Sequence, residues 1–502
     1  MKTIPLFQLF VLTGALGGST AAADPRTNSW LTSYSGQYAR IYSSDTAKAS
    51  GTTSTTWSRG VGVQSLPTYC GISQVAFSTD WVYLRTTGLG SHVMGPWYLN
   101  AEHTVNFPNF PANTATLYRI PRSPFVPGNK TLTGNGAIGI FVDGVVMFDS
   151  RDAFSYSTAN AADAQPGGAF VGDGCWNRDA FVNEGVTFDS GNAHQAGKQY
   201  HYHANPPALR YLLGDHVTYD AAAKTYAEAT NEPAHSPILG WVRDGFPVYG
   251  PYGYSVSNNA ASGVRRMISG YIKRDGSFGS TNLGLTGRTT LPTWAALAQN
   301  RSAILPMNRY GPATNATYTL GHYIEDYDYL GDLGVTPGTD TFDLDQYNGR
   351  FCVTPEFPEG TYAYFVAIET NGIPRFPYNI GRWFFGSATG NTVASITEAV
   401  TTNFSGGTKG SLIASAPTVD IASGNVTLTW SSIDGGTYVV EATTNLTSWS
   451  AITTNAPGAT QTNLPNAKTS RSVVDNAAAT LMPERYYRIR LSATNSYDSA
   501  GF

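Results

Sequence analysis

The sequence predicts a mainly β protein with a β-sandwich-like central domain and a small C-terminal β-sandwich. Charged residues are only 13% of the chain, aromatic residues are another 13%, and Gly and Thr are frequent, which suits strands joined by tight turns. Runs rich in β-branched and aromatic residues recur between turn residues, as at 75–84 and 425–430. With 502 residues the chain exceeds the ~250–300 at which a single core stops growing, so two or more domains are expected.

The amino terminus predicts export. Lys2 is followed by a mostly apolar stretch at 4–16 and by the small residues at 21–23, which is the pattern of a secretory signal and its cleavage site. We therefore expect a secreted or periplasmic protein. No later apolar run reaches the roughly 18 residues that a spanning helix needs, so no membrane span is predicted. The net charge of −4 gives no reason to propose nucleic acid as a partner.

The composition changes along the chain and predicts its domains. Asp143-Gly144 lies between two apolar runs, which indicates a hairpin in the central part. A stretch rich in Gly, Ser and Thr near the carboxyl end is typical of a linker, and alternating strands follow it. The predicted parts are a signal peptide at 1–23, a polar segment at 24–59, a central domain at 60–400, a linker at 401–411 and a β-sandwich at 412–502.

The most informative motif is Tyr200-His201-Tyr202-His203. Successive side chains of a strand alternate between faces, so the two histidines would share one face and the two tyrosines the other. Neighbouring neutral imidazoles suit zinc or copper. His194 precedes the motif by a polar segment with a glycine that could fold it back towards the pair. The alternative is a partly exposed strand whose Tyr and His tips are merely hydrogen-bonded.

Other residues are candidates for the same site. His235, in a loop with two prolines, is a fourth possible ligand. Asp244 precedes a glycine, where a carboxylate either caps nearby backbone or hydrogen-bonds the far nitrogen of a liganding histidine. In the second case it would orient the ligands together with Asp189, Tyr200 and Tyr202.

The central domain also contains a predicted internal repeat. The segment at 188–203 has a counterpart at 342–365. The tyrosines match between these two segments, whereas all three histidines are replaced in the second. We infer that the tyrosines serve the fold in both copies and that the histidines serve something present only in the first. Chance similarity of two Tyr-x-Tyr strands is the alternative. The paired segments are Phe188-Asp189 with Phe342-Asp343, Asn192-Ala193-His194 with Asn348-Gly349-Arg350, and Tyr200-His201-Tyr202-His203 with Tyr362-Ala363-Tyr364-Phe365.

The blocks at 194–206 and 244–250 resemble the family of secreted proteins named after its YHYH motif. The segments at 138–145, 348–350 and 358–362 are similar to it as well, so the resemblance covers about 60 to 390. It implies an exported, β-rich domain and a suspected metal site, with no settled activity. The C-terminal part resembles fibronectin type III-like modules, which implies a spacer or a surface-binding module.

Two functions of different classes follow. The first is an exported protein that binds zinc or copper through His194, His201, His203 and His235, as a possible metal-dependent enzyme of unknown substrate. The second is a carbohydrate- or surface-binding protein without metal, in which the tyrosines of 249–254 stack on sugar rings. The partner is accordingly an unknown small molecule or a glycan. A purely structural surface-layer role is a third possibility.

Overall fold

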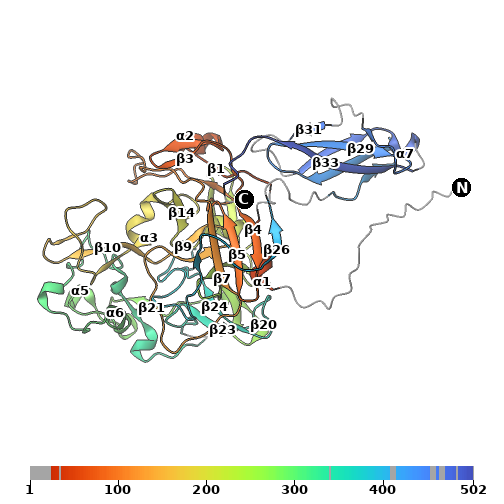
Figure 1. Ribbon diagram of the computed structural model, residues 1–502. Helices are drawn as coiled ribbons and strands as arrows, with labels where there is room; N and C mark the ends of the chain where they lie inside the picture. The colour runs from red at the N-terminus through yellow and green to blue at the C-terminus, as the bar shows by residue number, and fades with distance from the viewer. Residues whose placement is uncertain are drawn as a thin grey trace.

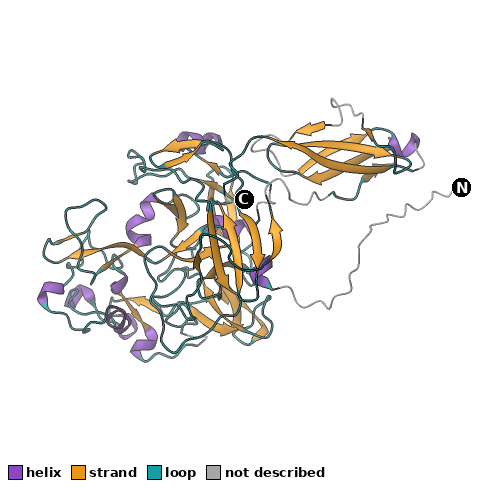
Figure 2. Ribbon diagram, in the orientation of Figure 1, coloured by secondary structure: helices purple, strands orange, loops and turns teal. Residues whose placement is uncertain are grey.

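The structure is a computed structural model. It describes residues 24–32, 36–338, 341–406, 414–452, 460–462, 470–481 and 484–500. The predicted signal peptide and positions 407–411 of the predicted linker lie outside the described residues. The fold is mainly β, as the sequence predicts, and Figure 2 shows a large body of strands, loops and short helices with a smaller unit, mostly of strands, beside it.

Two sheets form the centre of the large body. One has five strands in the order β25-β7-β5-β4-β26, and the other has eight in the order β13-β14-β9-β8-β17-β18-β24-β23. The first comprises β4 Ile72–Phe77, β5 Trp81–Thr86, β7 Thr116–Pro121, β25 Asn391–Thr392 and β26 Thr401–Ser405. The second comprises β8 Ala137–Phe141, β9 Val146–Phe148, β13 Ala193–Ala196, β14 Gln199–Tyr202, β17 Ile238–Val242, β18 Pro247–Tyr249, β23 Gly349–Cys352 and β24 Thr361–Phe365.

The main core draws buried side chains from both sheets, which gives the central domain its sandwich-like arrangement. Val75 and Leu84 come from the five-stranded sheet, whereas Ile140 and Val248 come from the eight-stranded one. The N-terminal segment contributes Trp30 to the same core. Positions 401–405, at the start of the predicted linker, pair with β4 in the five-stranded sheet.

Smaller sheets and short helices cover the rest of the body. The strands are β1 Arg40–Ile41, β2 Trp57–Arg59, β3 Gly62–Gln64, β6 Val93–Met94, β10 Arg151–Ser157, β11 Ala162–Asp163, β12 Asn177–Asp179, β15 Val217–Asp220, β16 Thr225–Glu228, β19 Tyr252–Val256, β20 Asn259–Arg266, β21 Tyr271–Lys273 and β22 Tyr327–Tyr329. The helices are α1 Pro25–Asn28, α2 Asp45–Ser50, α3 Ala180–Glu184, α4 Pro207–Leu212, α5 Leu283–Thr286 and α6 Thr293–Gln299, with single 3₁₀ turns that include η2 Gly185–Thr187. Within the described ranges, no helix combines the length and the apolar character needed to cross a membrane.

The eight-stranded sheet consists of two copies of a four-stranded unit. Each copy has a first hairpin, β8-β9 or β17-β18, whose second strand runs parallel to one strand of a second hairpin, β13-β14 or β23-β24. The copies meet where β8 pairs antiparallel with β17, and there Ile140 lies opposite its own counterpart, Trp241. This two-fold arrangement supports the predicted repeat.

The register of the second hairpins aligns the two copies residue by residue. His194 lies opposite His201, as Arg350 lies opposite Ala363. Asn192 and Asn348 adopt left-handed backbone, with φ of 63° and 65°. The sequence comparison was wrong at one point, because the counterpart of Asp189 is Asp345 and not Asp343.

Asp189 and Asp345 make the same hydrogen bonds. The backbone N–H of Gly191 donates to Asp189 at 2.8 Å, and that of Tyr347 donates to Asp345 at 2.9 Å. Each aspartate also accepts from the first tyrosine of its Tyr-x-Tyr strand, Tyr200 at 2.7 Å and Tyr362 at 2.9 Å. The two aspartates therefore tie the turn before the hairpin to its second strand in the same way.

The second tyrosine of each strand bonds the aspartate of an Asp-Gly turn. The Tyr202 hydroxyl donates to Asp143 at 3.2 Å, and the Tyr364 hydroxyl donates to Asp244 at 2.6 Å. The glycine after each aspartate has φ near +85°, a conformation that glycine adopts without strain. Asp143-Gly144 forms the hairpin that the sequence predicts, and Asp244-Gly245 forms its counterpart.

The C-terminal unit is a two-sheet sandwich. Its strands are β27 Thr418–Asp420, β28 Asn425–Ser431, β29 Gly436–Thr443, β30 Ser450–Ala451, β31 Thr460–Thr462, β32 Ser470–Asp475 and β33 Tyr486–Thr494, with a short helix α7 Ala478–Leu481. One sheet holds β27, β28 and β32, and the other holds β29, β30, β31 and β33. The resemblance to fibronectin type III-like modules stays a prediction.

The C-terminal unit packs directly against the large body (Figure 1). Tyr38 and Tyr69 of the body belong to its core, beside Trp430. The backbone N–H of Tyr38 donates to Asp434 at 2.9 Å, and Gln64 donates to Asp498 at 3.0 Å. The two parts are therefore joined by a shared core as well as by the chain.

We expect Tyr202→Phe and Tyr364→Phe to destabilise the protein by similar amounts. Each change removes the phenol that donates to a fully buried aspartate, and removing one hydrogen-bond partner of a buried polar group costs about 1–3 kcal/mol. Urea unfolding followed by tryptophan fluorescence measures the loss. Tyr211→Phe, on a 43% exposed ring, is the control and should unfold like the wild type. A wild-type midpoint in both core variants would contradict this assignment.

Stability should fall steeply above pH 10. Burial and neighbouring carboxylates hold the pKa values of Tyr202 and Tyr364 well above their usual range. The unfolded chain releases these protons near pH 10 while the folded chain keeps them, so the free energy of unfolding falls as pH rises. Each such tyrosine contributes up to about 1.4 kcal/mol per pH unit. The double variant Tyr202→Phe/Tyr364→Phe should show a shallower decline between pH 10 and 11, and an unchanged slope would contradict this account.

Candidate metal centre

The β13-β14 hairpin brings three histidines together. His194 on β13 pairs with His201 on β14, and His203 follows directly after β14. One ring nitrogen from each histidine lies within 4.8 Å of the others, and all three residues are buried. The tyrosines of the motif point to the opposite face and join the main core, as the strand period predicts. Figure 1 shows α3 beside this hairpin.

Backbone carbonyls fix the proton position on two of the rings. His201 Nδ1 lies 3.1 Å from the Gln199 carbonyl oxygen, and His203 Nδ1 lies 2.7 Å from the Asp149 carbonyl oxygen. A carbonyl oxygen only accepts, so both Nδ1 atoms must carry the proton. The Nε2 atoms of the two neutral rings are left with bare lone pairs.

A hydroxyl does the same for the third ring. The Thr187 hydroxyl donates its proton to the Glu184 carbonyl oxygen at 2.6 Å. Thr187 Oγ1 also lies 2.7 Å from His194 Nδ1, and it can only accept there because its single proton is already used. His194 is therefore protonated at Nδ1 as well, and its Nε2 is bare.

The three bare nitrogens face one another, which is the arrangement a metal ion requires. His201 Nε2 and His203 Nε2 lie 3.0 Å apart, and neither atom carries a proton with which it could donate a hydrogen bond to the other. Two lone pairs at this distance repel unless a cation binds both. Neutral imidazoles oriented by a hydrogen bond at the far nitrogen are the usual donors to zinc and copper. The residues present thus fit a transition metal.

Burial keeps the rings neutral. Desolvation and the neighbouring imidazoles lower the pKa values of His194 and His201 well below the usual range, and desolvation lowers the pKa of His203 to about 4. Phe148 stacks on His201 with ring centroids 3.9 Å apart, and Phe188 lies edge-on to His194 at 4.8 Å. The donors are therefore available at neutral pH, in apolar surroundings.

Glu184, which the sequence analysis did not single out, faces the triad. Its Oε2 lies 3.4 Å from His203 Nε2 and 3.7 Å from His194 Nε2. Burial, reinforced by the nearby charge of Asp152, raises the pKa of Glu184 to about 8. Glu184 is the last residue of α3, and a lone glutamate before a glycine at a helix end carries no sequence signal of a ligand.

His235 does not join the triad. It lies in the second half of the sheet, where its ring contacts Tyr249 at 5.2 Å and Tyr254 at 4.7 Å between centroids. Its Nδ1 bonds the carbonyl oxygen of Ser236 at 2.8 Å. The loop that precedes β17 therefore leads away from the first half, which the sequence alone did not reveal.

The residues predicted to orient the ligands bond elsewhere. Tyr200 and Tyr202 lie on the opposite face of β14 and bond Asp189 and Asp143, and Asp244 bonds Tyr364. The far nitrogens of the triad bond Thr187 and two backbone carbonyls instead. Alternation along the strand explains the difference, because a tyrosine next to a histidine points away from it.

The second half of the sheet lacks the donor set. Arg350, Ala363 and Phe365 occupy the positions of His194, His201 and His203. The Arg350 guanidinium lies 5.5 Å from the centroid of the Phe365 ring and 3.8 Å from Asp343, which corresponds in position to Thr187. This half therefore keeps the tyrosine hydrogen bonds and has a fixed side-chain cation in place of ligands.

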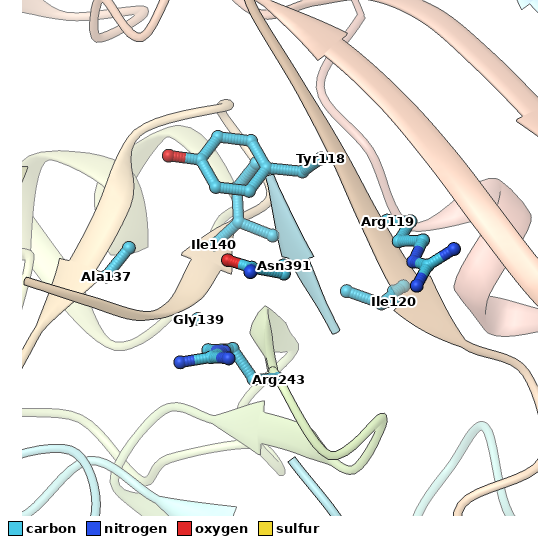
Figure 3. Close-up of a pocket in the computed structure, with 8 residues that line it drawn as sticks. All are labelled: Tyr118, Arg119, Ile120, Ala137, Gly139, Ile140, Arg243 and Asn391. Carbon is cyan, nitrogen blue, oxygen red and sulfur yellow. The ribbon is translucent and has the colours of Figure 1, made fainter. Parts of the chain in front are cut away.

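A surface hollow elsewhere on the molecule is not this site. It lies between β7 and β8 (Figure 3), and its lining contains no carboxylate, thiol or imidazole. The lining residues are Tyr118, Arg119, Ile120, Ala137, Gly139, Ile140, Arg243 and Asn391. The chemistry of the donors thus favours the triad as the functional site.

Comparison with known proteins places the chain in a family. Residues 117–377, just over half of the chain, match the family described as YHYH protein, and the chain belongs to this family. The matched region contains both copies of the four-stranded unit and the whole triad. Comparisons with curated proteins and with solved structures give no match.

We expect Thr187→Val to weaken metal binding about 10–100-fold, because loss of the acceptor at Nδ1 frees the His194 ring to adopt the other tautomer. Competition titration with a zinc chelator measures the affinity. Thr354→Val is a matched control, since Thr354 is also buried and bonds Tyr249 at 2.8 Å in the second half. Wild-type affinity in the Thr187 variant would contradict the tautomer assignment.

Proposed function

We propose that this protein is an exported protein that binds one transition metal ion, zinc or copper, through the Nε2 atoms of His194, His201 and His203. The observation that carries the proposal is the convergence of three unprotonated ring nitrogens, each fixed by a hydrogen bond at Nδ1. Export is proposed from the signal-like amino terminus.

The chain's own residues prepare the site before any ion arrives. Thr187 and the carbonyls of Gln199 and Asp149 orient the rings, so little conformational freedom remains to be lost on binding. Phe148 and Phe188 limit the access of water. A bound zinc or copper ion would supply Lewis acidity or, for copper, redox chemistry.

The alternative of a glycan-binding surface has less support. A glycan-binding surface would require the tyrosines of 249–254 to stack on sugar rings. Tyr249 and Tyr252 are buried, and their hydroxyls bond Glu356 and Glu228, each at 2.8 Å. Tyr254 is only partly exposed and contacts His235. These rings therefore serve the interior of the second half.

We expect one equivalent of zinc or copper in the purified protein and none in the folded double variant His201→Ala/His203→Ala, because two of three donors are lost. Elemental analysis after dialysis measures the content, and circular dichroism checks the fold. His235→Ala is the matched control and should retain the metal, since this histidine lies outside the triad. Equal, negligible metal in all three proteins after metal loading would overturn the proposed function.

A further inference from the structure

We propose that the Glu184 carboxylate is the fourth ligand of this centre, which makes it a site of three imidazoles and one carboxylate. The inference rests on the proposed function, and it adds to it the donor set that the ion meets. It also identifies the side from which an external molecule reaches the ion.

Three of the donor separations are close to those of a four-coordinate site. Ligand atoms about 2.0–2.1 Å from a tetrahedral zinc ion lie about 3.3–3.4 Å from one another. Glu184 Oε2 lies 3.4 Å from His203 Nε2 and 3.7 Å from His194 Nε2, and the Nε2 atoms of His201 and His203 lie 3.0 Å apart. The distances from the carboxylate oxygen to the ring nitrogens are therefore those between two ligands of one ion. They are too short for a water molecule to lie between the carboxylate and the ion.

The hydrogen bonds leave the carboxylate without a donor. No N–H or O–H group of the described ranges donates to the Glu184 side chain, and the nearest ring nitrogens are acceptors themselves. The buried aspartates around the site are treated differently. Asp179 accepts from the Tyr378 hydroxyl at 2.7 Å, and Asp189 accepts from Tyr200 and from backbone N–H groups. The described residues thus give Glu184 no hydrogen-bond donor, and a cation between the carboxylate and the rings would be its partner.

Charge points to the same conclusion. A divalent ion held by three neutral imidazoles among phenylalanines would keep its full charge in surroundings that solvate it poorly. One carboxylate reduces the net charge by one. Arg178 lies near Glu184 but pairs with Asp152 at 2.8 Å, so the described residues give Glu184 no ion pair with a lysine or arginine.

The chain path fixes Glu184 and a ring of the triad together. Glu184 ends α3, and η2 follows directly with Thr187. The Thr187 hydroxyl bonds both the Glu184 carbonyl oxygen and His194 Nδ1, so one short segment positions the carboxylate and orients a histidine. Asp179 caps the start of this segment by accepting from the Val182 N–H at 3.0 Å.

Glu184 is also the ligand that solvent reaches. Its side chain is 25% exposed, compared with 6% for His194 and 4% for His203. With all four donors bound, a tetrahedral ion has no open position. An oxygen-donor molecule from outside would therefore bind by replacing the carboxylate, because the imidazoles are enclosed and held at Nδ1.

The test uses the full-length protein loaded with Zn²⁺ or Co²⁺ alone. We expect Glu184→Gln to lower zinc affinity on the order of 100-fold, since even an outer hydrogen-bond partner is worth about 10–100-fold. We also expect its Co²⁺ absorption bands to differ from those of the wild type. Glu356→Gln is the matched control, because it makes the same change in the second half, where Glu356 accepts from Tyr249 at 2.8 Å.

A second variant tests the inference by a new absorption band, which misfolding of the protein would not produce. Glu184→Cys should show an intense thiolate-to-Co²⁺ charge-transfer band in the near ultraviolet, which the wild type lacks, because the wild-type cysteines lie in other parts of the core. Unchanged affinity in Glu184→Gln, the same loss in Glu356→Gln, or no such band in Glu184→Cys would overturn the inference. A wild-type protein that binds no metal would overturn the proposed function instead.

Discussion

The geometry of the candidate metal centre depends on the alternation of side chains along β14. Hydrogen bonds buried on one face of this strand fix that alternation. Tyr200 and Tyr202 donate to Asp189 and Asp143 inside the main core. Turning either ring to the other face would break a buried hydrogen bond to a carboxylate, at a cost of about 1–3 kcal/mol. The pleat then sends the two histidines of the motif to the opposite face. The donor geometry is thus a consequence of hydrogen bonds on the far side of the same strand.

A comparison of the two halves of the eight-stranded sheet distinguishes the residues that form the fold from the histidines, which occur only in the first half. Both halves keep the strand order, the Asp-Gly turn and the tyrosine–aspartate pairs, so these features suffice to form the unit. The second half has Ala363 and Phe365 where the first has histidines. Buried imidazoles with converging lone pairs are unfavourable in the absence of a cation, and the second half avoids them. Their presence in the first half therefore indicates a role other than folding.

Sequence reasoning found the donors but not the groups that support them. The motif and the strand period predicted that His201 and His203 share a face, and a glycine-containing segment predicted the return of His194. The acceptors at Nδ1 include two backbone carbonyls, which have no residue identity to recognise. Glu184 was missed because its position beside the triad depends on how a short helix packs against a hairpin. His235 was included because a loop gives no indication of which half of a duplicated sheet it approaches.

Sequence patterns alone predict the mainly β class, the Asp-Gly hairpin, the facing of the Tyr-x-Tyr strands and the loss of all three histidines in the second copy. These are local properties, set by strand alternation and turn chemistry within a few residues. The equivalence of Asp345 and Asp189, the tautomers of the triad and the approach of Glu184 became visible in the folded chain. These depend on contacts between segments that the chain brings together only on folding, and burial then turns each contact into a constraint on charge and protonation.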